Sequence, residues 1–242
     1  MRHKHLWLAA ALMMMLMLMA GCNNEYKAEV EQINSGIEAL STVKSGHITV
    51  TTNVYAENDA FDAYDSANVA DYRYQIDIKT FNFVAETRDL ATGQVIVEPY
   101  KVIDAEKFDL ATGVQDTEYE GKIGDFPDLL PFYFSSGLKN KFVGSIEVLT
   151  DENHPDWQGW RVYKSDKYIE RTNKTRSKEG VDGTMLEHYV DYWLDADGVL
   201  VRMNYVSRDD MTYEGKQDTV YQSYLFEMLD YNNPEIFAAY AE

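Results

Sequence analysis

The side chains with the widest chemical repertoire in this sequence are three histidines beyond the N-terminal segment: His47, His154 and His188. A neutral imidazole acts as a general base or a metal ligand when a second reactive group lies within hydrogen-bond distance. None of the three belongs to a motif that supplies such a group, and the sequence contains no Gly-x-Ser-x-Gly elbow, no His-Glu-x-x-His and no phosphate-binding glycine loop. We therefore predict a protein that is not an enzyme, with no catalytic residue, no metal site and no cofactor.

Clustered carboxylates are the second group considered, because they can bind divalent cations. Residues 57–71 hold five acids and no Lys or Arg, but their spacing matches no metal site. Residues 151–156 resemble a calcium loop only in composition, since Asp156 stands where an EF-hand needs glycine. An EF-hand alignment on residues 195–198 fails because it puts Trp193 at the first ligand position. We interpret these segments as a solvated connection or short helix, a polar turn and a hairpin turn.

Residues 164–178 contain the one basic cluster of the chain: Lys164, Lys167, Arg171, Lys174, Arg176 and Lys178. Such a cluster could meet an anionic lipid headgroup or a cell-wall polymer. Asp166 and Glu170 interrupt it, as they would on an ordinary solvated surface. The cluster is therefore predicted to be a solvated hairpin.

The single cysteine, Cys22, follows an N-terminal segment with two cations and fifteen apolar residues from Leu6 to Ala20. This run is shorter than the roughly 20 residues of a membrane-spanning helix and has the order of a secretory signal. The small residues Ala20 and Gly21 before Cys22 resemble the lipobox of bacterial lipoproteins. The resemblance implies that residues 1–21 are a signal peptide, that Cys22 is diacylated, and that residues 22–24 tether the protein to the cell membrane.

The charge of the chain limits its partners. It has 22 Lys and Arg against 41 Asp and Glu, and two of the cations lie in the signal, so the predicted mature protein has a net charge of −21. Such a surface repels phosphate backbones and anionic headgroups, which excludes nucleic acid. Membrane contact is expected through the Cys22 anchor, and a basic protein or peptide is the kind of protein partner that the charge favours.

Two periodicities predict the elements that position these residues. Between residues 25 and 41 apolar residues recur every three or four positions, which is typical of an amphipathic helix. Apolar and polar residues alternate around residues 48–54, and strand character also marks 72–83, 141–149, 157–163, 187–194, 199–207 and 219–231. The repeated Asp-Leu-Ala-Thr-Gly at 89–93 and 109–113 and the Asp-Gly at 197–198 predict hairpin turns.

One apolar segment interrupts this pattern between residues 125 and 134. Pro127 and Pro131 forbid a central strand there, so a short helix or two that covers the sheet is expected. We predict that this segment lines a ligand-binding site with Phe126, Leu129, Leu130, Phe132, Tyr133 and Phe134.

The order of these features resembles the LolA-like and LprG/LppX-like envelope lipoproteins, especially those of Gram-positive bacteria. The closest local matches are Val43-Lys44-Ser45-Gly46 before the first strand and Tyr192-Trp193-Leu194-Asp195 before the Asp-Gly turn. The resemblance implies an α+β fold in which residues 25–242 form a single β-rich domain. Its strongly curved antiparallel sheet would be a half-barrel, with an N-terminal amphipathic helix and a short helical insertion on the concave face.

The expected function follows from this resemblance and from the apolar segment. The first hypothesis is a membrane-anchored extracytoplasmic lipoprotein that binds a lipid or another hydrophobic ligand in the half-barrel. The alternative is an envelope interaction module, such as a sensor, an adaptor or an immunity-type lipoprotein, with a filled core and no small-molecule ligand.

Overall fold

The computed structural model describes residues 25–57, 66–76, 81–103, 106–118, 137–180, 182–213 and 215–236. The predicted signal peptide, the Cys22 anchor and the apolar segment 125–134 lie outside these residues. The first half of the described chain contains α2 (Lys27–Ser41), β1 (Ser45–Ala56), β2 (Ser66–Ile76), β3 (Phe81–Asp89), β4 (Val95–Ile103) and β5 (Glu106–Asp109).

The second half begins with a short 3-10 turn, η4 (Asn140–Phe142), and β6 (Val143–Leu149). It continues with β7 (Gln158–Lys164), α3 (Asp166–Glu179), β8 (Gly183–Leu194), β9 (Leu200–Tyr213), β10 (Lys216–Tyr231) and η5 (Pro234–Ile236). Neither described α-helix is long and apolar enough to cross a bilayer.

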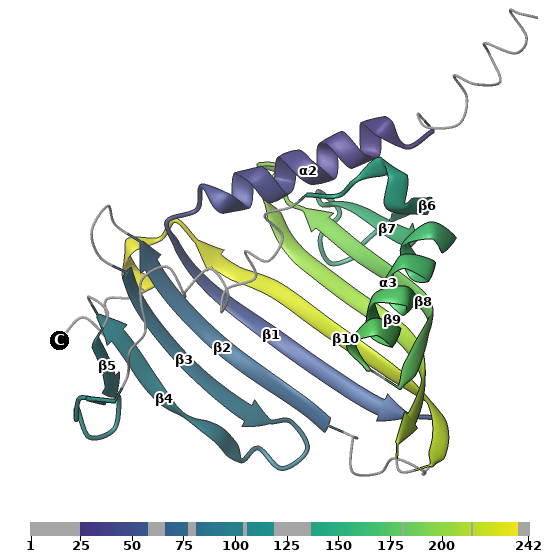
Figure 1. The fold of residues 1–242 in the computed structure, drawn as a ribbon. Helices are drawn as coiled ribbons and strands as arrows, with labels where there is room; N and C mark the ends of the chain where they lie inside the picture. Colours follow the sequence, from purple (N-terminus) through teal and green to yellow (C-terminus); the bar gives the residue numbers. More distant parts are fainter. Residues whose placement is uncertain are drawn as a thin grey trace, which may run out of the picture.

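All ten described strands form one antiparallel sheet in the order β5-β4-β3-β2-β1-β10-β9-β8-β7-β6 (Figure 1). Each half of the chain is a meander, and the two meanders meet where β1 pairs with β10 from Gly46 to Ala56. β5 and β6 remain as edges, so the sheet is open. The α+β class and the antiparallel order are therefore confirmed.

The predicted strong curvature is wrong, because the sheet is neither closed nor strongly curled. Antiparallel sheets curve sharply where bulges interrupt the ladder. The β9–β10 ladder, from Lys216 to Glu227, runs without a single register shift, and the β1–β2 ladder is also continuous. Register shifts do occur in the β1–β10, β3–β4, β6–β7 and β8–β9 ladders, but they do not roll the sheet into a half-barrel.

The hairpin turns formed as predicted, and the reason is local chemistry. In both pentapeptides the aspartate carboxylate accepts a backbone hydrogen bond from the threonine three residues later, at 2.7 Å for Asp89 and for Asp109. The glycine that ends each turn has a positive φ, 69° at Gly93 and 67° at Gly113, which only glycine adopts without strain. The same chemistry closes the turn at Asp195, whose carboxylate accepts from the backbone N–H of Val199.

Two local predictions need correction. The strand expected over residues 72–83 is two antiparallel strands, β2 and β3, and Tyr74 of one pairs with Phe83 of the other. The segment 57–71 is also not one connection, because β2 begins at Ser66. Both errors arose because the sequence between these strands carries no glycine or proline to mark a turn.

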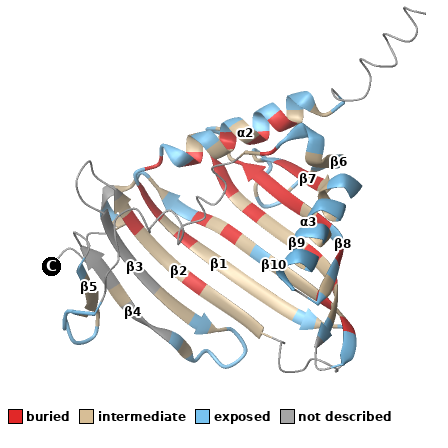
Figure 2. Cartoon of the chain, viewed as in Figure 1, coloured by how far each residue is buried: buried red, intermediate tan, exposed pale blue. Residues whose placement is uncertain are grey.

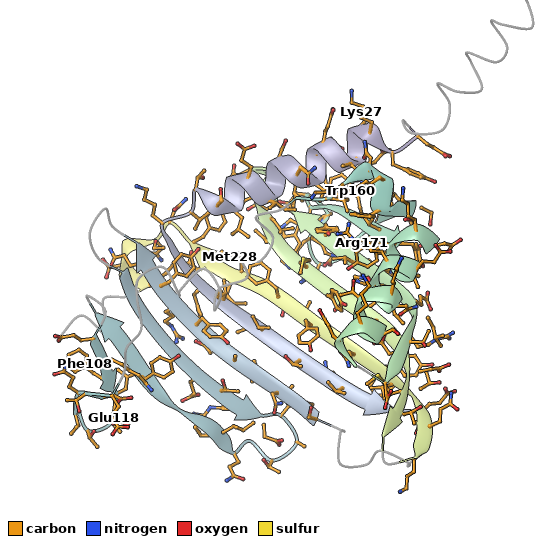
Figure 3. All side chains as sticks on the ribbon, viewed as in Figure 1. Lys27, Phe108, Glu118, Trp160, Arg171 and Met228 are labelled. Carbon is orange, nitrogen blue, oxygen red and sulfur yellow. The ribbon has the colours of Figure 1, made fainter. Side chains whose placement is uncertain are left out.

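The buried core lies on the side of the sheet that carries α2 and α3, which we call the helix face. Figure 2 shows that buried positions gather on β8, β9, β10, β1 and the inner side of α2, and in Figure 3 Trp160 lies near α2 and Arg171 belongs to α3. The least exposed apolar side chains are Ile33, Ile48, Val162 and Leu200, each at 0–1%. Buried apolar residues run from Val30 to Met228, so a polypeptide of residues 25–242 retains every one of them and should fold on its own.

Helix α2 confirms the predicted amphipathic helix, and its one glycine has a packing role. Gly36 is buried against β8, where an added Cβ would lie 2.6 Å from Cγ of Leu194. Glycine in a helix costs about 1 kcal/mol relative to alanine. Here that cost is offset by the close approach of α2 to the sheet.

We predict that Gly36→Ala destabilises the protein although it improves helix propensity. The methyl group would overlap Leu194, and overpacking costs about 1–3 kcal/mol. After the propensity gain, the expected net loss is about 1 kcal/mol, measured by urea unfolding of residues 25–242. The matched control is Ser35→Ala at the neighbouring exposed position. A Gly36→Ala variant as stable as Ser35→Ala would contradict the packing role.

Candidate ligand pocket

A pocket of about 430 Å³ opens on the helix face between α2, α3 and strands β7 to β9. Eight of its twelve lining residues are aliphatic, aromatic or thioether side chains, and the others are a glycine, two lysines and a histidine. The lining comprises Ile37, Gly137, Leu138, Lys139, Phe142, Lys164, Tyr168, His188, Val190, Tyr192, Met203 and Tyr205.

The floor of the pocket is made by alternate residues of β8 and β9. Side chains two apart on a strand point to the same face, so Val190 and Tyr192 share the helix face with His188. The register places Val190 opposite Tyr205 and Tyr192 opposite Met203. This cross-strand arrangement produces a continuous apolar floor.

Residues 137–142 form the wall beneath α2. The side-chain amide of Asn34 donates to the carbonyl of Leu138 at 3.0 Å and accepts from its backbone N–H at 2.6 Å. The ring of Phe142 meets the ring of Tyr168 edge to face at 5.5 Å. These contacts tie the wall to both helices.

Helix α3 corrects the prediction of a solvated hairpin over residues 164–178. Its C-cap is Gly180 in the left-handed conformation, and Asp166 in the first turn and Arg176 and Lys178 in the last turn complement the helix dipole. No residue of α3 is buried, so it lacks the apolar stripe by which a helix is predicted from sequence. The expectation that the basic residues are mostly solvated remains correct for the exposed Lys167, Arg171, Lys174 and Lys178.

Polar contacts hold α3 on the sheet. The amide of Asn173 donates to the carbonyl of Met185 at 3.0 Å and accepts from its N–H at 2.8 Å. One turn later, Nη1 of Arg176 lies 2.5 Å from Oδ1 of Asp209, a carboxylate with no exposed surface. A buried charge needs such a partner, because isolation in the interior costs several kcal/mol.

His188 is the most unusual group in the pocket. Its side chain is 2% exposed, and neither ring nitrogen has a hydrogen-bond partner in the described structure. The ring packs against Tyr205 at 4.2 Å and Tyr168 at 5.4 Å. Burial, with a smaller effect of the nearby Lys164 and Arg176, lowers the pKa of His188 to about 3, so the imidazole is neutral at physiological pH.

Lys164 ends β7 at the side of the same pocket. Its ammonium lies 5.6 Å from the centre of the Tyr168 ring, and no ion pair to Lys164 occurs among the described residues. Burial lowers the pKa of Lys164 to about 8. The group therefore remains mostly charged at neutral pH, although part of its hydration is lost.

Ser207, His188 and Asp209 share residue types with a catalytic triad but not its geometry. In a triad the histidine accepts the serine proton and the acid orients the histidine. Here the Ser207 hydroxyl donates to Oδ2 of Asp209 at 2.9 Å, and Asp209 is paired with Arg176. His188 makes no hydrogen bond to either. The arrangement supports helix docking and does not activate a nucleophile.

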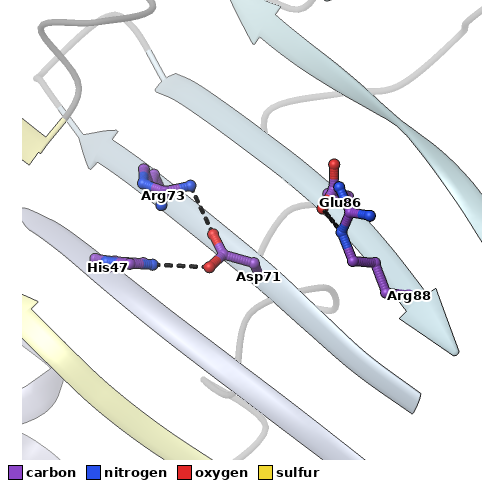
Figure 4. Close-up of polar contacts among 5 residues, drawn as sticks. All are labelled: His47, Asp71, Arg73, Glu86 and Arg88. Atoms are coloured by element: carbon purple, nitrogen blue, oxygen red, sulfur yellow. Dashed lines mark hydrogen bonds and ion pairs between the residues drawn. The ribbon is translucent and has the colours of Figure 1, made fainter. Parts of the chain in front are cut away.

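The other histidines lie away from this pocket. On the outer face, opposite the helices, Nε2 of His47 lies 2.9 Å from Asp71, whose other oxygen accepts from Arg73 at 2.6 Å (Figure 4). Arg88 and Glu86 pair beside them. His154 stacks on Trp157 at 3.9 Å in the turn that precedes β7. His47 thus lies on a polar strand face, and His154 lies in the turn predicted for residues 151–156.

Other carboxylates on the outer face form ion pairs with arginine side chains of the protein. Arg202 bridges Asp151 at 2.6 Å and Glu227 at 3.0 Å, and Arg161 binds Asp191 through two hydrogen bonds. Among the described residues no group of three or more His, Cys, Asp and Glu is arranged to hold a metal ion. Asp151 and Asp71, both drawn from the acidic segments considered above, act as ion-pair partners.

The predicted ligand-binding residues from Phe126 to Phe134, like the Cys22 anchor, lie outside the described residues and stay predictions. The pocket instead combines side chains that the sequence predicts to lie in the core or on a solvated surface. The available signal was the spacing of His188, Val190 and Tyr192, which places the three side chains on one face of β8. The sequence places Lys164 among the solvated cations, and nothing in its sequence neighbours marks it as partly buried.

Because burial depresses the pKa of His188, we predict that this residue makes the protein acid-sensitive. The unfolded chain binds a proton near pH 6.5, whereas the folded protein binds it only near pH 3, so stability falls as the pH drops through this window. At about pH 5 the loss is about 2 kcal/mol. Urea unfolding at about pH 7.5 and pH 5 measures it.

The matched variant is His188→Phe, which retains an aromatic ring and cannot titrate. Other titrating groups contribute equally to both proteins, so His188→Phe should lose about 2 kcal/mol less than the unmodified protein over the same pH interval. Equal losses in the two proteins would show that His188 titrates normally in the folded state.

Because Asp209 is fully buried, we predict that Arg176→Met is strongly destabilising. Removal of one member of a buried ion pair leaves an uncompensated charge and costs about 3 kcal/mol. Lys174→Met on the exposed side of α3 is the control and should change stability by less than about 0.5 kcal/mol. The double variant Arg176→Met/Asp209→Asn should recover part of the loss. An Arg176→Met variant as stable as Lys174→Met would contradict the role of Arg176 in holding α3 on the sheet.

Comparison with known proteins finds no matching family model and no matching curated protein. A LolA superfamily protein from Nitrosomonas europaea is similar at 9% identity, over 86% of this chain and 96% of that protein, with a TM-score of 0.26. A porin-like protein from Bacteroides uniformis shows 10% identity, 76% and 96% coverage and a TM-score of 0.24. The 12:0-ACP thioesterase from Umbellularia californica shows 12% identity over 79% of this chain and 76% of that protein, with a TM-score of 0.19. The predicted LolA-like resemblance thus has only a weak fold-level counterpart, and membership of that family stays a prediction.

Proposed function

We propose that this protein is a membrane-anchored extracytoplasmic lipoprotein, without enzymatic activity, that binds a lipid or another hydrophobic ligand in the pocket on the helix face. One observation carries the proposal: a pocket of about 430 Å³ with a predominantly aliphatic and aromatic lining. Pockets that bind small hydrophobic molecules have about 300–1,000 Å³ and a few polar groups in an apolar lining. Both features match.

The position of the pocket within the core supports the same function. A filled core would bring α3 against the sheet through apolar side chains, as α2 does through Val30, Ile33 and Leu40. Instead α3 is attached by Asn173 and Arg176 and contributes the rim residue Tyr168 to the pocket. Space for a ligand therefore remains between the two helices.

The predicted anchor would bring this pocket close to the membrane. Four residues lie between Cys22 and the start of α2 at Lys27, and the five residue-to-residue steps span at most about 18 Å when extended. Ile37 lies ten residues into α2, about 15 Å further along the helix axis. A lipidated Cys22 would thus keep the pocket within a few tens of ångströms of the bilayer, where hydrophobic ligands are found.

The second candidate is an interaction module that binds a basic protein or peptide. The net charge of −19 favours it, because complementary charge accelerates association and disfavours anionic partners. On that view the pocket has no ligand. The two candidates therefore differ in whether an uncharged apolar probe enters the pocket.

We predict that residues 25–242 bind the uncharged fluorophore N-phenylnaphthylamine and that Ile37→Trp weakens this binding at least about tenfold. Ile37 lines the pocket from α2, and an indole at this position would occupy part of its volume. Fluorescence titration measures the dissociation constant.

The matched control introduces the same side chain at an exposed position of the same helix, Ser35→Trp, and should bind the fluorophore normally. Urea unfolding of each variant verifies that it is folded. An unmodified protein that fails to bind the fluorophore, or an Ile37→Trp variant that binds as tightly as Ser35→Trp, would rule out this ligand site and favour the interaction module.

A further inference from the structure

We propose that the pocket selects amphiphiles with an anionic head group, which binds at Lys164 and His188 while the hydrocarbon chain lies along the apolar floor. This inference rests on the proposed function and names the class of ligand. It follows from the polar groups of the lining and not from pocket volume.

The charge of the lining is opposite to the charge of the protein. Acidic residues outnumber basic ones by 41 to 22 in the chain, yet the pocket lining contains no carboxylate and includes Lys139, Lys164 and His188. A pocket in an acidic protein would be expected to repel anions unless local cations reverse the potential. The two lysines of the lining, with no carboxylate among the described lining residues, would make the local electrostatic potential positive.

Lys164 is a partly desolvated cation that lacks a counter-ion in the described structure. Burial of a charge without a partner is unfavourable, so an anion bound beside it would be stabilised more than at the surface. The nearby charged residue on α3, Arg176, is already paired with Asp209 at 2.5 Å. Among the described lining residues, Lys164 is therefore the partly buried cation that remains for a ligand, whereas Lys139 is exposed.

His188 supplies a hydrogen-bond donor for the same head group. Because the ring is neutral, one nitrogen carries a hydrogen, and neither nitrogen finds an acceptor or a donor among the described residues. An unsatisfied buried polar group costs about 1–3 kcal/mol. The hydroxyl of its cross-strand partner, Ser207, donates to Asp209. A carboxylate or phosphate oxygen in the pocket would satisfy the His188 N–H.

The remaining titratable groups around these two residues leave the preference for an anion unchanged. Tyr168 of α3 and Tyr205 of β9 face His188, and burial raises the pKa of Tyr205 to about 12, so its phenol stays neutral. Lys139 adds positive charge at the rim, and the nearby acid Asp209 is neutralised by Arg176. The apolar floor of Val190, Tyr192 and Met203 continues from this end and would contact the hydrocarbon chain.

The test compares ligands with one hydrocarbon chain and different heads by displacement of N-phenylnaphthylamine from residues 25–242. Dodecanoate should bind at least about tenfold more tightly than dodecanol, and dodecyltrimethylammonium should bind more weakly than either. Dodecyl phosphate separates the two sources of an anionic head: tighter binding than dodecanoate indicates a phosphate-bearing lipid, and weaker binding indicates a fatty acid.

Lys164→Met should reduce the affinity for dodecanoate about tenfold and leave dodecanol and the fluorophore unchanged. Lys164→Arg, which keeps the charge, should retain most of the preference for dodecanoate. The matched control is Lys167→Met, an exposed lysine on α3, which should behave as the unmodified protein. Because only a folded pocket binds the fluorophore, this design separates a lost head-group site from an unfolded variant.

The pH dependence is a second readout. Affinity for dodecanoate should be constant from about pH 6 to pH 7.5 and fall above about pH 8 as Lys164 of the free protein loses its proton. In Lys164→Met this decline should disappear.

Equal affinities of dodecanoate and dodecanol, or a Lys164→Met variant with an unchanged preference, would overturn the inference. Failure of the fluorophore to bind would overturn the proposed function itself.

Discussion

The antiparallel pairing of β1 with β10 is the interaction on which the rest of the structure depends. It joins the first strand of one meander to the last strand of the other, residues that lie about 170 positions apart at the pair Asn53 and Ser223. Because α2 directly precedes β1, the pairing of β1 with β10 places α2 above the C-terminal half of the sheet. There α2 packs on β8 and β9. The pocket lies under α2 for this reason. Without the β1–β10 ladder, the apolar stripe of α2 would have only its own meander to cover.

The two helices cover the sheet by different physical means, and the pocket exists between them because of this difference. Helix α2 buries aliphatic side chains and lets Gly36 approach Leu194 closely, as a core element does. Helix α3 is attached through an amide that bonds a backbone and through an arginine that neutralises a buried aspartate. Hydrophobic packing is non-directional and closes space, whereas hydrogen bonds fix two groups at set distances. A helix held by the second kind of contact leaves volume beside it.

The charged residues also differ between the two sides of the sheet. On the outer face carboxylates meet arginines of neighbouring strands, as Asp191 meets Arg161 and Glu227 meets Arg202, so much of the local charge is balanced. In the pocket a lysine and a neutral histidine are left without such partners in the described structure. An acidic protein with a cationic apolar pocket is suited to hold an anionic amphiphile near a membrane, because the surface would repel other anionic molecules while the pocket accepts this one. The lipid anchor predicted at Cys22 would maintain that position against the repulsion between the protein surface and anionic headgroups.

Much of the secondary structure could be predicted from local sequence. Alternation marks β1, the spacing of Val30, Ile33 and Leu40 marks α2, and Asp and Gly mark the turns. Local sequence failed where the stabilising contacts are distant. Helix α3 lacks an apolar stripe because it docks through Asn173 and Arg176, and the shape of the sheet depends on pairing between strands far apart in the chain, such as β1 and β10. By itself, then, the sequence determined most of the strands, the hairpin turns, the amphipathic helix and the acidic surface, because each depends on neighbours a few residues away. The tertiary structure alone decided that Ile37, Lys164, His188 and Tyr205 share one pocket, in which His188 is buried and Lys164 is partly buried. Desolvation and the absence of a partner are properties of a three-dimensional environment, which here is assembled from six segments of the chain joined by the β1–β10 pairing.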